Sequence, residues 1–133
     1  MQRVEIKELD YFEDDRGWLL KVLKQEYFGK NTLGEIYITT ANPGIVKAKH
    51  YHKYTNEWFC VIKGTGKLVL QDLDTEEKKE ITMGDGKFVT VKIPFGIVHA
   101  VKNIGKEMMY LIAIADQPYN RENPDTYFYN LVI

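Results

Sequence analysis

The three histidines of the chain are spaced like the ligands of a metal ion. His50 and His52 lie two residues apart, Glu57 follows five residues later, and His99 lies farther along the chain. Neutral imidazole is the commonest nitrogen ligand for divalent metals in proteins. On a strand, residues two apart project to the same face, so His50 and His52 could bind one ion while Tyr51 faces the other way. The pattern predicts three nitrogen ligands and one carboxylate, with coordination positions left open for water or substrate.

The alternative is structural, because a lone histidine in an apolar strand is more often a hydrogen-bonded core residue than a ligand. The combined spacing of all three histidines and Glu57 favours the metal site over that alternative. Glycines and a proline at 44, 64, 94 and 96 flank the candidate ligands. We interpret them as turn residues, with the 94–96 turn directing His99 inward.

Length and composition narrow the classes of function. At 133 residues the chain fits a single domain, 1–133. A formal net charge of -1 offers no global field for binding nucleic acid or an anionic membrane, so we expect neither partner. Cys60 is the only cysteine, which excludes an internal disulfide. We find neither a signal-peptide pattern nor an apolar run of about 20 residues, and we expect a cytoplasmic protein.

Short runs rich in β-branched and aromatic residues alternate with turn signals along the whole chain. Nine such strands predict an all-β, antiparallel sandwich or barrel. The glycines at 64 and 66 and at 84 and 86 predict tight hairpins, and 24–30, the best helix candidate, is interpreted as a connecting turn. The expected strands are 17–23, 34–40, 45–52, 57–63, 67–72, 80–83, 88–93, 97–103 and 107–114.

The strand 57–62 carries bulky apolar residues on both of its faces, unlike a half-solvated strand. If its odd-numbered residues point into the barrel, Trp58, Cys60 and Ile62 point outward and need a cover. A second subunit is the simplest cover in so small a protein, which predicts a homodimer. The alternative is that N-terminal strands of the same chain cover this face.

The two motifs together resemble those of the cupin superfamily. The first is Gly44-His50-His52-Glu57-Gly64 and the second is Pro94-Gly96-His99-Asn103. Phe88 stands where the second motif usually has a glycine, so the hairpin before it is longer here. The resemblance implies a small double-stranded β-helix, or jelly-roll barrel, with the ion in its mouth.

The flanking segments are similar to two more specific groups. Residues 4–20, with Arg16-Gly17, resemble the opening of the dTDP-4-dehydrorhamnose 3,5-epimerase (RmlC-like) family. Residues 84–128, with 93–96 and 122–128, resemble the cupin half of bifunctional capsular-polysaccharide enzymes of the CapF type, in which a reductase precedes a cupin that epimerises a UDP-4-keto sugar. The resemblance implies a nucleotide-sugar substrate, surface-polysaccharide biosynthesis and a separately encoded sugar-nucleotide reductase as a partner.

The rhamnose-pathway epimerases work without metal, and the difference is informative. Their His-Phe-Gln segment matches His50-Tyr51-His52, and their enolate-stabilising lysine matches Glu57. Histidine and glutamate thus replace glutamine and lysine, and a metal could take over the lost lysine's role of holding an oxyanion. We expect a divalent cofactor, zinc in preference to iron, manganese or nickel.

The expected reaction is epimerisation or isomerisation at C3, beside the C4 ketone of the sugar, by proton removal and return on the opposite face. Tyr119 resembles the epimerases' proton donor, although it could equally be a surface aromatic. His50 is either a ligand or the base, but not both. Arg16 is the best candidate to clamp a diphosphate. Lys47 and Lys49 should point away from the mouth if His50 points in, where Lys49 could meet phosphate at a subunit boundary.

Two other functions remain open at this point. One is a non-catalytic sugar-binding cupin whose metal is structural. The other is a metal-dependent oxygenase, which three histidines and a glutamate would also serve. Tightly bound zinc would oppose the oxygenase, because zinc has no redox chemistry.

Overall fold

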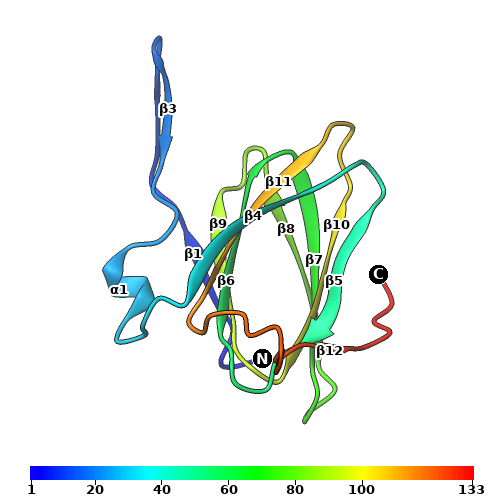
Figure 1. The fold of residues 1–133 in the computed structure, drawn as a ribbon. Coiled ribbons are helices and arrows are strands. Elements are labelled where there is room, and N and C mark those ends of the chain that lie inside the picture. Colours follow the sequence, from blue (N-terminus) through cyan, green and yellow to red (C-terminus); the bar gives the residue numbers. More distant parts are fainter.

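Two five-stranded antiparallel sheets face each other around a common interior (Figure 1). The computed structural model describes residues 1–133. The first sheet has the strand order β1-β9-β6-β11-β4 and the second the order β12-β5-β10-β7-β8, while β2 and β3 form a separate pair. This arrangement confirms the all-β cupin barrel. The strands are β1 (Glu5–Glu8), β2 (Tyr11–Asp14), β3 (Gly17–Leu20), β4 (Glu35–Ala41), β5 (Val46–Tyr51), β6 (Glu57–Lys63), β7 (Thr65–Asp72), β8 (Lys78–Gly84), β9 (Val89–Ile93), β10 (Ile97–Asn103), β11 (Met109–Ala115) and β12 (Tyr127–Phe128).

All nine expected strands are present, and β6 and β10 have the expected bounds. The helical segment α1 (Gln25–Phe28) is a single turn inside the expected connection, and no helix is long and apolar enough to span a bilayer. The expected hairpin at residues 64–66 is absent, whereas the tight turn at 84–86 is present and closes with an antiparallel bridge between Gly84 and Lys87. Each of these turns joins strands of different sheets, β6 to β7 and β8 to β9, and thereby closes the barrel.

The interior is apolar at one end and polar at the other. Fifteen buried hydrophobic residues from both sheets form the main core, among them Val61, Leu68 and Leu111. Phe59 packs edge-on against His99, with 5.4 Å between the ring centroids. The contact between Phe59 and His99 is thus where the apolar core meets the candidate ligands.

The outward face of β6 is covered within one chain. Trp58 is 2% exposed and Cys60 is 0% exposed. The ring of Phe28 in α1 lies 4.9 Å from that of Trp58, and Thr90 on β9 donates a hydrogen bond to the carbonyl of Val22 (2.6 Å). The segment that leads into α1 therefore provides the cover expected from a second subunit. The interpretation of this face as a subunit interface is wrong, and the homodimer stays a prediction.

The pair β2–β3 projects from the barrel as an arm (Figure 1). Its base is fixed by aromatic packing, because Tyr11 stacks on Phe88 with 5.0 Å between centroids. At its turn, Arg16 donates hydrogen bonds to the Asp14 carboxylate at 2.6 and 3.1 Å. Arg16 thus lies on the arm, whereas the histidines lie inside the barrel.

Candidate metal centre

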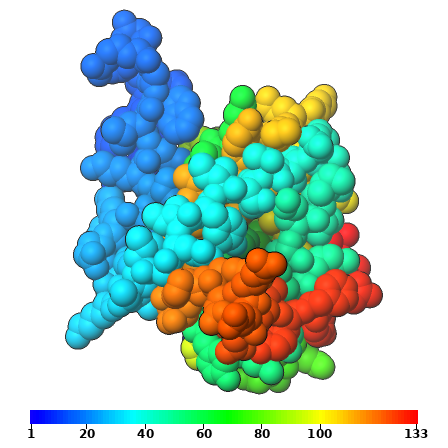
Figure 2. Space-filling model, viewed as in Figure 1, coloured from blue at the N-terminus to red at the C-terminus, as the bar shows by residue number.

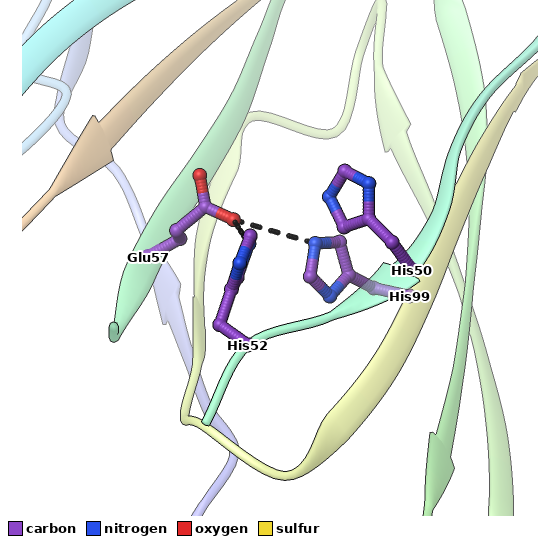
Figure 3. Close-up of side chains that lie close together, drawn as sticks. All are labelled: His50, His52, Glu57 and His99. Carbon is purple, nitrogen blue, oxygen red and sulfur yellow. Dashed lines mark hydrogen bonds and ion pairs between the residues drawn. The ribbon is translucent and has the colours of Figure 1, made fainter. Parts of the chain in front are cut away.

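His50, His52, Glu57 and His99 converge in the mouth of the barrel (Figure 3). His50 lies on β5 and pairs with His99 on β10, so the two neighbouring strands present their rings to the same interior. His52 follows β5 directly, and Glu57 opens β6. One ligand atom from each side chain lies within 4.8 Å of all the others. The juxtaposition expected from the spacing is therefore present.

Glu57 is the acceptor at the centre of the cluster. Its Oε1 lies 2.6 Å from Nε2 of His52 and 3.3 Å from Nε2 of His99, and its Oε2 accepts a hydrogen bond from the Tyr37 hydroxyl (3.0 Å). The carboxylate is only 3% exposed, so it is held by side chains of the chain itself rather than by solvent.

Backbone carbonyls fix the other ring nitrogens of two histidines. Nδ1 of His99 donates to the carbonyl of Ile97 (3.0 Å), and Nδ1 of His52 donates to the carbonyl of Asp125. Such bonds set the tautomer of a metal-binding histidine and leave its Nε2 for the ion. In both rings Nε2 is the atom turned toward Glu57.

The surroundings shift the pKa values of His50, His52 and Glu57, and not all in the same direction. Burial, reinforced by the neighbouring His99 and His52, lowers the pKa of His50 to about 3. Burial also opposes charge on His52, but the hydrogen bond to Glu57 outweighs it and raises the pKa of His52. For Glu57, burial is outweighed by the hydrogen bond to His52 and by the nearby His99, which together lower its pKa. At neutral pH His50 is therefore a neutral imidazole, a form suited to binding metal.

The donor set fits a divalent metal ion. Nε2 of His99 is buried and makes no hydrogen bond of acceptable geometry, although Glu57 Oε1 is 3.3 Å away. A buried polar atom without a partner is costly in a folded protein. Three imidazoles and one carboxylate match the ligands that zinc and other first-row metals take. The cluster could therefore bind a metal, and an ion would give His99 Nε2 its partner.

A cavity of about 430 Å³ opens above the cluster. His50, His52 and Glu57 lie among its lining residues, as do Tyr37 and Tyr119. Figure 2 shows this face, where the segment after β11, in orange, lies across the opening between β4 and β5. Tyr119 thus lines the same cavity as the histidines and is 62% exposed, and its role as a proton donor stays a prediction.

Lys47 points into the barrel, against the expectation for this strand. His99 pairs with His50 but Ala100 pairs with Ala48, so Lys49 is an extra residue in a β-bulge. Ala48 and Lys49 both have positive φ angles, 74° and 62°, a conformation that costs a non-glycine residue about 1–2 kcal/mol. The bulge shifts the alternation of β5 by one residue. Lys47 consequently lines a cavity of about 190 Å³ together with His50, and the expectation that it points away is wrong.

The other two candidate cations lie elsewhere. Lys49 reaches the C-terminal segment, where its Nζ donates to Oδ1 of Asn130 (3.4 Å). Arg16 remains on the arm, beside Asp14. Neither side chain lines the cavity above the cluster, and their roles in substrate binding stay predictions.

Sequence reasoning missed Tyr37 and Asp125 as partners of the cluster. For Tyr37 a signal existed in β4, where Glu35, Tyr37 and Thr39 alternate with Ile36 and Ile38. Glu35, Tyr37 and Thr39 line the two cavities, whereas Ile36 and Ile38 are more than half exposed. In an ordinary half-buried strand the apolar side chains would face the interior and the polar ones the solvent. For Asp125, the carbonyl accepts a hydrogen bond from His52, which lies in a distant segment, so no pattern in the neighbouring sequence indicates the contact.

Comparison with known proteins links the chain to polysaccharide biosynthesis. A family described as "Polysaccharide biosynthesis C-terminal domain" matches residues 12–127. The UDP-2-acetamido-2,6-beta-L-arabino-hexul-4-ose reductase of Pseudomonas aeruginosa is 32% identical over 114 residues, which are 86% of this chain but only 29% of that protein. The spore coat polysaccharide biosynthesis protein SpsL of Bacillus subtilis is 29% identical over 132 residues, covering 92% of this chain and 84% of the relative.

Two solved structures show where the fold occurs. The capsular polysaccharide assembling protein CapF of Staphylococcus aureus has a TM-score of 0.71 and 29% identity, over 92% of this chain and 34% of that one. The RmlC epimerase of Legionella pneumophila, in complex with dTDP-4-keto-L-rhamnose, has a TM-score of 0.83 at 14% identity, over 96% of this chain and 73% of that one. The second match shows a shared fold. The resemblance to the CapF-type enzymes is thereby confirmed, and the resemblance to the RmlC-like epimerases is confirmed for the fold.

Proposed function

Because the chain belongs to the polysaccharide biosynthesis C-terminal domain family, we propose that it acts on a nucleotide-linked 4-keto-hexose during assembly of a surface polysaccharide. The reaction is inversion, or isomerisation, at C3. One observation carries the proposal: three imidazoles and a carboxylate converge beneath a cavity large enough for a sugar ring. Similar proteins that act in sugar and polysaccharide biosynthesis support the substrate class.

The chemistry needs a place for negative charge and a path for a proton. A divalent metal held by His50, His52, Glu57 and His99 would supply a Lewis acid that stabilises the enolate oxygen at C4. A base removes the C3 proton, the electron pair moves onto the C4 oxygen, and an acid returns a proton to the opposite face of C3.

The residues of this chain that could serve these steps line the two cavities. Tyr119 is the proposed acid, because it lies in the cavity wall and its hydroxyl can carry a proton. Lys47, which lines the smaller cavity beside His50, adds positive charge on the side of the barrel where the candidate metal ligand His50 lies. His50 is assigned as a ligand rather than the base, since an imidazole with a pKa of about 3 is a weak proton acceptor at neutral pH.

The chain spans 29% of the reductase from Pseudomonas aeruginosa and 34% of CapF. A reductase activity therefore lies outside the proposal for these residues. We propose that a sugar-nucleotide reductase acts on the product or on its precursor, as a partner in the same synthesis.

We also propose a homodimer, now on different grounds. Ile36 and Ile38 on the outer side of β4 are 58% and 61% exposed, and β4 is an edge strand. Exposed apolar edge strands are normally paired or covered. Sedimentation analysis should give twice the 15.5 kDa mass of one chain, and a mass of 15.5 kDa at micromolar concentration would refute the dimer.

The experiment has two parts on the same preparation. Protein purified without a histidine tag is first analysed for its elemental metal content. It is then incubated in deuterium oxide with UDP- and dTDP-linked 4-keto-6-deoxyhexoses, and deuterium at C3 is measured by mass spectrometry. About one zinc per chain, with exchange at C3, is the expected result.

Each other result favours a different function. Bound zinc and bound nucleotide sugar without exchange would leave a sugar-binding cupin with a structural metal. Iron without exchange would favour oxygenase chemistry. Exchange in protein stripped of metal would return His50 to the role of base and refute the metal-assisted reaction.

A further inference from the structure

The segment that follows β11 lies over the cluster and is attached to the barrel at two aspartates. We call residues 116–126 the C-terminal strap; in Figure 2 it is the orange part of the surface in front of the opening. Asp116 begins the strap and Asp125 lies near its end, just before β12 pairs with β5 at Tyr51 and His50. Between the two aspartates, the hydrogen bonds of the strap are internal, from the amides of Glu122 and Asn123 to Asn120.

Asp125 binds the loop that leaves His52. Its carboxylate accepts hydrogen bonds from the backbone amides of Lys53 and Tyr54, both at 2.7 Å, and from the Thr55 hydroxyl at 2.9 Å. Its own carbonyl accepts a hydrogen bond from Nδ1 of His52. One residue therefore holds both the ring of His52 and the backbone that follows it.

Asp116 binds the other end of the same loop. Its carboxylate accepts the backbone amide and the side-chain amide of Asn56, each at 2.9 Å. Asn56 immediately precedes Glu57, and its Oδ1 accepts the backbone amide of Phe95 (3.1 Å), in the turn that leads to His99. This second anchor thus connects the strap to the segments that carry Glu57 and His99.

The loop 53–56 connects His52 directly to Glu57. The backbone amides of residues 53, 54 and 56 all donate hydrogen bonds to the carboxylates of Asp116 and Asp125. Hydrogen bonds to an ionised carboxylate are stronger than neutral ones. Groups that orient metal ligands commonly change metal affinity by 10–100-fold when they are removed. We propose that Asp116 and Asp125 are positioning residues through which the docked strap sets the metal affinity of the cluster. The inference rests on the metal site of the proposed function, and is independent of the sugar reaction.

The test measures the zinc dissociation constant by competition with a chelator, in the full chain. Asp125→Ala and Asp116→Ala should each bind zinc about 10–100-fold more weakly than the parent. Asp125→Asn, which keeps one acceptor oxygen, should lose less. Asp72→Ala is the matched control, because the Asp72 carboxylate also accepts two backbone amides, those of Asp74 and Thr75, but contacts none of the four cluster residues.

A second readout separates positioning from general destabilisation. In the metal-free parent, nitrogen NMR should find Nδ1 of His52 protonated and hydrogen-bonded, and Asp125→Ala should alter that signature while Asp72→Ala leaves it unchanged. Zinc affinity within about twofold of the parent in Asp125→Ala, or an equal loss in Asp72→Ala, would overturn the inference, as would a parent chain that binds no zinc. Failure of C3 exchange in a parent whose zinc affinity depends on Asp125 would refute the sugar reaction alone.

Discussion

Replacing Glu57 by glutamine should greatly reduce the stabilisation that zinc gives the protein. Glutamine keeps the shape of the side chain but removes the charge that faces His52 at 2.6 Å and His99 at 3.3 Å. Its amide nitrogen must also face either these imidazoles or the Tyr37 hydroxyl, which now donates to Oε2 at 3.0 Å. The substitution thus removes one ligand without opening a cavity.

The magnitude follows from ligand linkage. Zinc at about 1,000 times its dissociation constant stabilises the folded state by about 4 kcal/mol. With an unfolding entropy of about 2.1 cal/mol/K for each of the 133 residues, this raises the parent's Tm by about 15 °C. If loss of the charged ligand weakens affinity about 100-fold, the upper end for an orienting group, about 1.4 kcal/mol or about 5 °C remains.

The assay is thermal unfolding of chelator-stripped protein, with and without zinc at that fixed concentration. Glu35→Gln is the control, because Glu35 lines the same cavity but is outside the cluster. It should show the parent's full zinc-dependent rise. An equal rise in Glu57→Gln and the parent would refute Glu57 as a ligand and, with it, the reasoning from the buried carboxylate.

Three further predictions concern single side chains. Tyr119→Phe should slow deuterium exchange at C3 by at least about 100-fold and leave zinc content unchanged, measured by mass spectrometry and elemental analysis; equal exchange rates would remove Tyr119 from the mechanism. Lys47→Met should reduce the exchange rate by about 100-fold at unchanged zinc content whereas Lys47→Arg keeps most of it, and a Met variant as active as the parent would place Lys47 outside the reaction. Burial raises the pKa of Cys60 to about 11, so the folded protein should not react with a thiol reagent at pH 8 until denaturant is added, and rapid reaction in the native state would contradict the buried position.

The sequence predicted the features that depend on local alternation and on ligand spacing. His50, His52 and Glu57 lie close along the chain, so strand periodicity and a short loop were enough to bring them together. His99 needed the antiparallel pairing of β5 with β10, which the turn at Pro94 and Gly96 and the resemblance to cupins supplied.

The errors arose where a distant segment or a break in periodicity decided the outcome. Trp58 is covered by Phe28 from α1, a contact that no pattern within β6 reveals. Asp125 reaches His52 from 73 residues away. The orientation of Lys47 was predicted wrongly because the bulge before His50 places Ala48 and Lys49 in a left-handed backbone conformation. Glycine usually marks that conformation in a sequence, and neither residue is a glycine.

The bulge in β5 also determines how the strand tolerates changes of length. Deleting one of residues 48 and 49 would leave Lys47 two residues before His50, so a regular strand without the bulge would keep both side chains inside the barrel. Inserting one residue there would also make the separation of Lys47 and His50 even, so a regular strand would again place both side chains on one face. The bulge thus lets a separation of three residues place Lys47 and His50 on the same face, and a strand one residue shorter would retain both the ion-binding histidines and the cation beside them.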